Sequence, residues 1–419
     1  MKTASAFFIA LRYLLGRAGE GGRYLRGAAS GIAVSLVPII VTLIVADGMI
    51  RGIIDRHLEL GTGHIQIRNL QEPMHPEAAL PYLEGISGIR GAWAEQQGIG
   101  VILGSSGSRG AAIRAVDNSF WDDPGGRRYL QNLSGEARPE TNRDVILGTE
   151  LARSIGASIG STVRIMTTHT TLEGRSIPCI TAFTVRGIVA SGYNELDALW
   201  CIMTLEAGRQ ILPETSAYLM LKIDDPYNRI GSMASSLEFR IGSGFRVSTW
   251  ESLLYAQYQS FASTRQLLLF IMALIVLVAA VNVSSATSML VFERQKDIAV
   301  LKAAGAGPSF TSAVFLWGAF LTGLTGAVSG IAFGLIIGCN VNTLVRLLER
   351  FLSFFTALFH AAPVTILDSG FYLETIPIIV NAKAIFAIGF FTIASSILAS
   401  WIPARNAGKL KPIDIFQKY

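Results

Sequence analysis

Residues 267–291 read LLLFIMALIVLVAAVNVSSATSMLV, and this stretch decides the class of fold. It belongs to a run of 27 uncharged residues between Arg265 and Glu293. A helix rises about 1.5 Å per residue, so about 20 apolar residues cross the roughly 30 Å hydrocarbon core of a bilayer. The stretch therefore predicts a helix that spans a membrane.

Three further uncharged runs extend this prediction, with 20, 43 and 21 residues at positions 27–46, 303–345 and 384–404. The 43-residue run could hold two spans. It opens on the turn-like AAGAGPS and ends on the polar CNVNTL, so we expect one long helix there. We therefore expect four spans, at 27–53, 263–292, 310–345 and 382–404, and an outer loop at 346–381 that contains a helix at 347–359.

The composition supports a soluble domain set into a membrane frame. Only 16% of the 419 residues are charged, against about 25% in soluble domains, and most of the charges lie between 50 and 260. The net charge of +5 could indicate nucleic-acid binding, but the basic residues flank the apolar runs, as the positive-inside rule expects, so we expect no nucleic acid as a partner.

Three basic clusters define the orientation. They precede the first span, follow the second and follow the fourth, and with four spans all three lie on one side. Both termini and the loop at 293–309 are therefore expected in the cytoplasm, with the tail at 405–419. Residues 1–26 mix apolar and basic side chains, which predicts an amphipathic helix on the inner membrane face. Residues 54–262 are then external.

The external segment has the pattern of an α+β domain. Seven short runs read as strands, at 63–69, 107–117, 143–148, 161–168, 182–190, 198–204 and 216–224. Three runs read as helices, at 149–156, 205–212 and 226–242. A polar stretch rich in turn formers starts near 121, so we expect two lobes, the second at about 126–214. The fold class is therefore a four-helix membrane protein with an external α+β domain.

The short motifs that could suggest a catalytic, nucleotide or metal site do not predict one here. Gly156–Gly160 spells GxSxG, but a helix precedes it and a strand follows, the reverse of a nucleophile elbow. The chain has no GxxxxGK[ST] and no paired histidines, so we expect no catalytic residues, no ATP site and no metal site; His64 reads as an ordinary strand residue. Cys179 and Cys201 could pair, although two free thiols are favoured.

Two features indicate a mechanical device. Residues 293–309 alternate charged and apolar side chains with helical spacing and end at glycines, which favours a short cytoplasmic lever over a solvated loop. Gly326, Gly330, Gly334 and Gly338 recur every four residues, so another helix can approach closely, either within the subunit or from a partner. The centres of the spans carry no charge, which argues against an ion relay.

These segments resemble a known family. The stretch FERQKDIAVLKAAGAGP, at 292–308, is similar to the coupling helix of the FtsX/MacB-like permease superfamily. LGTELARSIGASIGSTVRIMT, at 147–167, and PARNAGKLKPIDIF, at 403–416, resemble the lipoprotein-releasing permeases LolC and LolE within it. The resemblance implies a bacterial inner-membrane permease that pairs with a second copy or a paralogue. A separate LolD-like ATPase would use ATP and magnesium, and this chain would bind no cofactor.

The resemblance also implies three sets of site residues. The ATPase contacts would be Glu293, Arg294, Lys296, Asp297 and Lys302. The cavity for lipid and lipoprotein cargo, between the first two spans, would include Val41, Ile44, Met49, Ile53, Leu268 and Met272. A hairpin that holds a LolA-like periplasmic carrier would include Thr168, Leu172, Arg175 and Pro178.

Two other functions stay open. The hairpin at 168–178 is shorter than in LolC, which favours a LolE-like role or a different cargo. The chain could be a MacB-like efflux or mechanotransmission subunit with a separate ATPase. It could also be an FtsX-like signalling protein that activates a cell-wall hydrolase, although the external domain is large for that class.

Overall fold

The computed structural model describes residues 2–15, 21–70, 75–170, 176–358 and 376–410. The chain divides into two compact units. The described residues of the first, here called the helical unit, are 2–15, 21–49, 261–358 and 376–410. Those of the second, the sheet domain, are 50–70, 75–170 and 176–260.

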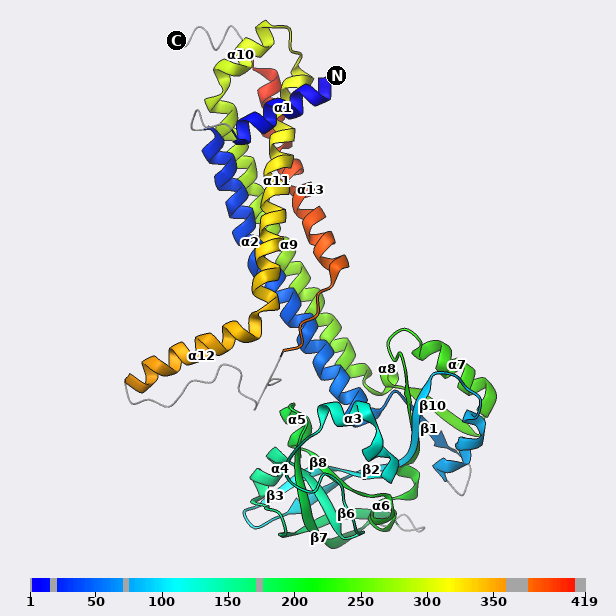
Figure 1. Ribbon diagram of the computed structural model, residues 1–419. Helices are drawn as coiled ribbons and strands as arrows, with labels where there is room; N and C mark the ends of the chain where they lie inside the picture. Colours follow the sequence, from blue (N-terminus) through cyan, green and yellow to red (C-terminus); the bar gives the residue numbers. More distant parts are fainter. Residues whose placement is uncertain (1, 16–20, 71–74, 171–175, 359–375, 411–419) are drawn as a thin grey trace. The chain divides into compact units, whose positions relative to one another are not determined.

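Among the described residues, four helices are long and apolar enough to cross a membrane: α2 (Gly21–Arg56), α9 (Tyr255–Glu293), α11 (Pro308–Cys339) and α13 (Ala382–Lys409). Three shorter helices accompany them: α1 (Lys2–Leu15), α10 (Gln295–Ala303) and α12 (Val341–Leu358) (Figure 1). The predicted fold class, four apolar spans with an α+β domain, is confirmed.

The glycine stripe of α11 packs against α2 of the same chain. A Cβ atom built on Gly330 would lie 2.8 Å from the Cβ of Leu36, and one on Gly334 would lie 2.7 Å from the Cβ of Ile40. Side chains that close leave no room for a methyl group. The stripe therefore serves packing within the subunit, one of the two alternatives that the sequence left open.

The third span ends earlier than predicted. We expected helix to position 345, but α11 ends at Cys339, where the backbone of Asn340 leaves helical geometry at φ −108° and ψ 15°. A new helix, α12, starts at Val341, before the predicted 347. The uncharged run continues to 345 because the first residues of α12 are also uncharged, so the length of the run overestimated the length of the span.

The N-terminal helix is shorter than the predicted segment 1–26. It ends at Leu15, and residues 21–26 already belong to α2. One face of α1 is buried, and the ring of Phe7 lies edge-on to that of Trp317 on α11, with centroids 5.2 Å apart. Packing on α11 therefore covers part of the apolar surface that made this helix look amphipathic.

The sheet domain is built on one ten-stranded mixed sheet. Its order is β10-β1-β9-β2-β3-β8-β5-β7-β4, and β6 pairs with β2 and β7. The strands are β1 (Ile65–Asn69), β2 (Ile89–Leu103), β3 (Ser108–Val116), β4 (Gln131–Gly135), β5 (Asp144–Gly148), β6 (Thr162–Thr170), β7 (Ser176–Ala190), β8 (Trp200–Thr204), β9 (Ala217–Ile223) and β10 (Phe245–Thr249). All seven predicted strands are present, and β2, β4 and β10 were missed.

Short helices cover this sheet. They are the π-helix η1 (His57–Thr62), the 3-10 helices η2 (Pro76–Leu83), η3 (Asn118–Asp122) and η4 (Glu214–Ser216), and α3 (Pro124–Tyr129), α4 (Thr149–Ile155), α5 (Asn194–Asp197), α6 (Leu205–Ile211), α7 (Ile230–Ile241) and α8 (Trp250–Leu253). The three predicted helices correspond to α4, α6 and α7.

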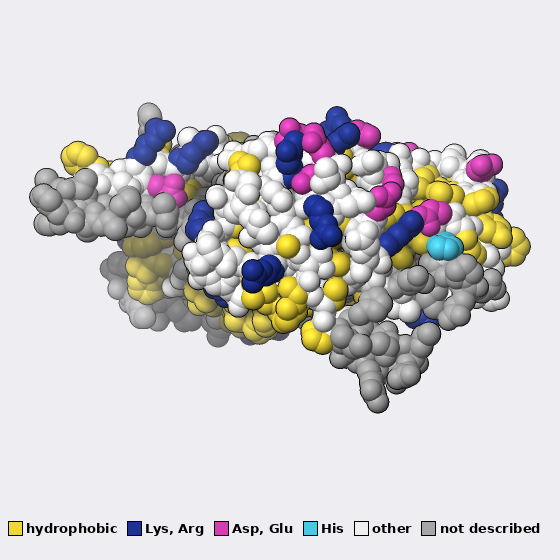
Figure 2. Space-filling view, turned by 90° about the horizontal axis from the view of Figure 1, so that it is seen from below, with side chains coloured by type: hydrophobic (Ala, Val, Ile, Leu, Met, Phe, Trp, Pro, Cys, Tyr) yellow, Lys and Arg dark blue, Asp and Glu magenta, His cyan; other side chains and the backbone are white. Residues whose placement is uncertain are grey.

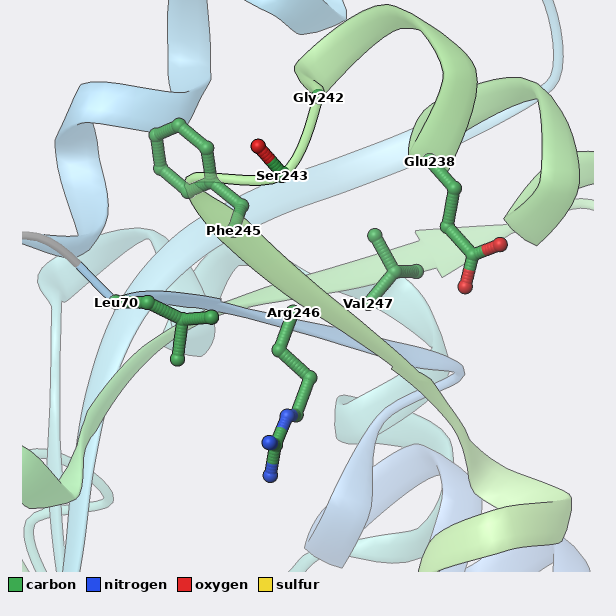
Figure 3. Close-up of a pocket in the computed structure, with 7 residues that line it drawn as sticks. All are labelled: Leu70, Glu238, Gly242, Ser243, Phe245, Arg246 and Val247. Carbon is green, nitrogen blue, oxygen red and sulfur yellow. The ribbon is translucent and has the colours of Figure 1, made fainter.

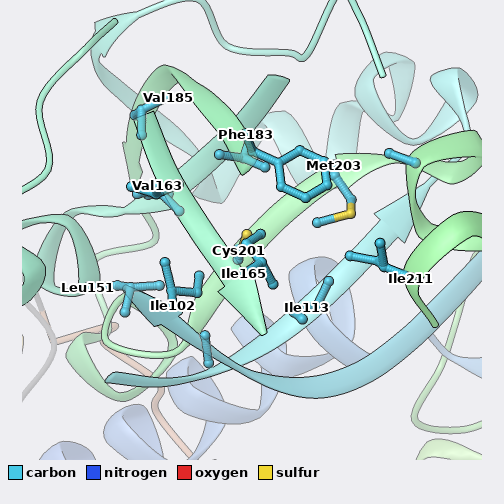
Figure 4. Packing of buried hydrophobic residues seen from close by; sticks show 14 of the residues in the cluster. Ile102, Ile113, Leu151, Val163, Ile165, Phe183, Val185, Cys201, Met203 and Ile211 are labelled. Atoms are coloured by element: carbon cyan, nitrogen blue, oxygen red, sulfur yellow. The ribbon is translucent and has the colours of Figure 1, made fainter. Parts of the chain in front are cut away.

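The main core of the sheet domain crosses the predicted lobe boundary. Ile102 on β2 and Ile113 on β3 pack with Phe183 and Met203 in one buried cluster (Figure 4). A second lobe that starts at 126 would leave β2 and β3 outside this core. Strands from both sides of position 126 therefore contribute to one sheet and to one buried core.

The cysteines are free thiols. Cys201 is buried in the main core, and burial raises the pKa of its thiol, while Cys179 on β7 is half-buried. The alternative of a disulfide between them does not hold.

A buried ionic cluster holds η1, which follows α2 directly. Lys222 on β9 is fully buried, and its ammonium donates to the Glu59 carboxylate (2.8 Å) and the Asp123 carboxylate (2.5 Å). Arg90 on β2 also binds Glu59, at 2.6 Å. Buried charges persist only when they are paired. Two cationic side chains from different strands, Lys222 and Arg90, therefore hold the Glu59 turn on the sheet.

Candidate functional site

The segment between α9 and α11 folds as helix α10, which packs on other helices of the helical unit. Helix α10 follows Arg294 and ends before Gly305, whose φ of +92° suits glycine. Ile298 and Ala299 are buried, whereas Val300 is 61% exposed. The cluster around Ile298 includes residues from α1, α2, α9, α11 and α13. Such packing on the neighbouring helices is what a lever requires.

Two of the predicted ATPase contacts face partners within the chain. The guanidinium of Arg294 lies 3.2 Å from the Asp297 carboxylate, and its carbon lies 5.3 Å from the centre of the Tyr13 ring. Burial and the nearby charge of Asp297 raise the pKa of Tyr13 to about 12. The phenol therefore stays neutral at physiological pH, and Arg294 and Asp297 join α10 to α1.

Lys302 is also engaged within the chain. Its ammonium donates to the carbonyl oxygens of Gly408 (2.7 Å) and Leu410 (2.5 Å) at the end of α13. The C-terminus of a helix carries partial negative charge, so a lysine is stabilising there. Of the other predicted contacts, Lys296 is exposed and Glu293 is half-buried.

A cavity of about 220 Å³ lies beside α10. Its lining residues come from α9, α10 and α13 and the residue after it: Ser288, Val291, Phe292, Gln295, Pro403, Asn406 and Leu410. Phe292 is 67% exposed at this place. Sequence reasoning missed the cavity because it selected charged residues, whereas the exposed surface here is largely apolar. The aromatic residue directly before the charged motif is the signal that could have found it.

The predicted lipid-cavity residues occupy different environments. Ile44 and Met272 are buried and, with the partly buried Leu268, belong to one cluster of the helical unit. Val41 and Met49 are half-buried. Ile53 packs against a core of the sheet domain. Ile44 and Met272 are thus covered by other residues of this chain, and the assignment of the six residues to a lipid cavity stays a prediction.

An ion pair joins α2 to α9 near these residues. The Asp47 carboxylate lies 3.2 Å from the Arg265 guanidinium, and the two residues bound the uncharged runs of their helices. Sequence reasoning used both to delimit uncharged runs and missed that they pair. The pair lies at the end of each span that adjoins the external segment in sequence.

The predicted carrier hairpin is partly described. Strands β6 and β7 pair in register, with Thr168 opposite Pro178, and both residues are exposed. Leu172 and Arg175 lie outside the described residues. Strands β6 and β7 are the two strands of a hairpin, as predicted for this place.

The sheet domain has a pocket and two stretches that the sequence singled out. An open pocket of about 390 Å³ lies beside the edge strand β10 (Figure 3), lined by Leu70, Glu238, Gly242, Ser243, Phe245, Arg246 and Val247. The GxSxG stretch lies between α4 and β6, where Gly156 ends the helix at φ +65°. His64 accepts a hydrogen bond from the backbone of Ile223 at 2.8 Å. The described residues contain no group of three or more metal-binding side chains.

The sequence matches two protein-family models and is similar to proteins of known name. A model of the MacB-like periplasmic core domain matches residues 27–235, and a model of the FtsX-like permease C-terminal domain matches 269–412. The lipoprotein-releasing system transmembrane protein LolC of Xylella fastidiosa (strain Temecula1) is 25% identical over 97% of both chains.

Two further similarities follow. The lipoprotein-releasing system transmembrane protein LolE of Haemophilus influenzae is 21% identical over 99% of both chains. The solved periplasmic region of MacB from Actinobacillus actinomycetemcomitans is 15% identical, with a TM-score of 0.31, over 48% of this chain and 95% of that one. Both family models match in the expected order, so the chain carries a MacB-like periplasmic core domain followed by an FtsX-like permease C-terminal domain.

Proposed function

We propose that this chain is the permease subunit of an ABC complex that extracts lipoproteins from the bacterial inner membrane and passes them to a periplasmic carrier. The observation that carries the proposal is the end-to-end match to lipoprotein-releasing transmembrane proteins. The efflux and signalling alternatives lack a comparable match among these relatives.

The surface of α9 suits an acylated cargo. Large apolar side chains are exposed along it, among them Leu267 (64%), Phe270 (63%) and Val278 (62%). Each CH₂ group of an acyl chain that is buried contributes about 0.8 kcal/mol. This surface, with a second copy or a paralogue facing it, would form the lipid cavity, which moves the expected contacts away from the buried Ile44 and Met272.

The cytoplasmic side would dock the ATPase. The exposed face of α10, with Lys296 and Val300, and the cavity beside Phe292 form the surface that a LolD-like subunit would contact. That subunit would bind ATP and magnesium. The packing of Ile298 would transmit its movement to the spans. Both termini would then be cytoplasmic and the sheet domain periplasmic, where the β6–β7 hairpin would meet a LolA-like carrier.

Affinity purification of the full chain from detergent-solubilised membranes tests this proposal. We expect a small ATPase and acylated lipoproteins to co-purify with the wild type. Val300→Asp should reduce the recovered ATPase at least about tenfold, because a charge would enter an apolar contact. The matched control is Ile99→Asp, at an 85% exposed residue of the sheet domain, which should keep the ATPase.

The negative outcomes are as informative. An ATPase with a hydrolase or an efflux adaptor, and no lipoprotein, would replace lipoprotein release by one of the alternatives. Equal recovery of ATPase with Val300→Asp and Ile99→Asp would show that the exposed face of α10 is not the docking surface.

A further inference from the structure

Helix α12 separates apolar and charged residues on two faces. At 100° per residue, Leu344, Leu347, Leu348 and Phe351 lie on one side, and they are 44%, 60%, 50% and 59% exposed. Arg346, Glu349 and Arg350 lie on the opposite side. An 18-residue helix is about 27 Å long, so this face presents a long apolar stripe.

The start of α12 lies at the end of a span. Only Asn340 separates it from α11, and Asn342 exchanges two hydrogen bonds with the backbone of Ile376, at 2.9 and 3.1 Å. These bonds fix its first turn beside the chain that leads into α13. On the last turns of α11, Phe333 and Ile336 are 58% and 60% exposed. The apolar surface of the span therefore continues directly onto α12.

We propose that α12 lies in the interface of the membrane leaflet, with its leucine face among the acyl chains and Arg346 and Arg350 at the level of the lipid phosphates. Its direction departs from that of α11 (Figure 1). Seen from below, basic side chains lie over α12 (Figure 2). An amphipathic helix with arginines on its polar face has this preference for a lipid surface.

The position gives α12 a function in transport. A helix embedded in the leaflet fixes the depth at which α11 and α13 end, and it displaces lipid beside the proposed cavity. The inference rests on the four spans and on the continuity with α11. It does not depend on the identity of the cargo, so it and the proposed function can fail separately.

Depth-dependent fluorescence quenching tests the inference on the full chain in phosphatidylethanolamine/phosphatidylglycerol vesicles. In a Cys179→Ser, Cys339→Ser background, a small fluorophore is attached to Leu348→Cys or to its matched control, Arg346→Cys, on the opposite face. Lipids brominated on their acyl chains should quench the probe at 348 at least about twofold more than the probe at 346, and aqueous iodide should show the reverse preference.

Two outcomes would overturn the inference. Equal quenching of both probes by brominated lipid would mean that the two faces of α12 share one environment, which is water if both are quenched weakly and acyl chains if both are quenched strongly. Shielding of the probe at 348 from both quenchers would mean that protein covers the face, either a second copy or another segment of this chain. Gel filtration of each labelled variant separates misfolding from these outcomes, and Leu344→Cys provides a second probe on the same face.

Discussion

The two units of this chain are held together by different physical means. In the helical unit, α11 and α2 meet through glycines, and its ion pairs among the described residues lie at the ends of the spans. In the sheet domain, a fully buried lysine holds two carboxylates, and Arg114 binds Glu95 with both side chains almost fully buried. The helical unit is thus held by the close approach of its helices, whereas the sheet domain also uses buried ion pairs.

The difference follows from what surrounds each unit. In a bilayer, the lipid is as apolar as leucine, so helices gain little from hiding apolar surface and depend on close packing. In water, burial of large apolar side chains drives folding, and a domain with that driving force can tolerate a buried ionic cluster. The comparison therefore predicts that charge removal damages the sheet domain most and that added volume damages the helical unit.

The largest effect is expected for Lys222→Met. Methionine fills a similar volume, but the carboxylates of Glu59 and Asp123 lose their central partner while they stay largely buried. Breaking a buried pair in this way costs about 3–5 kcal/mol. Thermal unfolding of the full chain in detergent, followed by tryptophan fluorescence, should show a lowered midpoint for the sheet domain.

Two further variants make that result specific. Lys222→Met combined with Glu59→Gln and Asp123→Asn removes the charges together and should recover part of the loss. Arg153→Met breaks an exposed pair with Glu150 and should cost less than about 1 kcal/mol. If Lys222→Met shifted the midpoint no more than Arg153→Met, the buried cluster would not hold η1 on the sheet.

The elements that sequence reasoning found are those with one dominant physical signal. The spans follow from uncharged length alone. Strand β2 was missed because Glu95 and Gln96 make a central strand look polar, and the partner that neutralises Glu95, Arg114, lies on β3. An ion pair between two strands is a tertiary contact, so the sequence of either strand alone does not reveal it.

The candidate site shows the same limit. The helix at α10 was predictable from spacing, because its buried and exposed residues alternate with helical period. The partners of its charges were not, because Lys302 bonds to carbonyls more than 100 residues away. The glycine stripe predicted close packing, and only the structure shows that the neighbour is α2.

An intermediate effect is expected for Gly330→Ala. The added methyl group would lie 2.8 Å from the Cβ of Leu36 and 3.0 Å from the backbone of Ala33, so α11 and α2 must separate. Overpacking of this kind costs about 1–3 kcal/mol. The measurement is the temperature at which half of the detergent-solubilised chain aggregates.

Gly318→Ala is the matched control on the same helix. Its added methyl group meets nothing within 4 Å, and alanine favours a helix by up to about 1 kcal/mol. This variant should be neutral or slightly stabilising. A loss as large as that of Gly330→Ala would mean that glycine is needed along α11 for a reason other than its contact with α2.

The smallest effect is expected for Lys302→Met, which tests whether charge matters where the helical unit meets water. The variant leaves the carbonyls of Gly408 and Leu410 without the ammonium that now donates to them. The loss is about 1 kcal/mol, which corresponds to roughly fivefold faster amide hydrogen exchange across α10. Lys296→Met, at an exposed position of the same helix, should change the exchange less. Equal exchange in both variants would mean that apolar packing around Ile298 alone holds the helix. The helical unit would then depend on packing and not on charge even where it meets water, unlike the sheet domain.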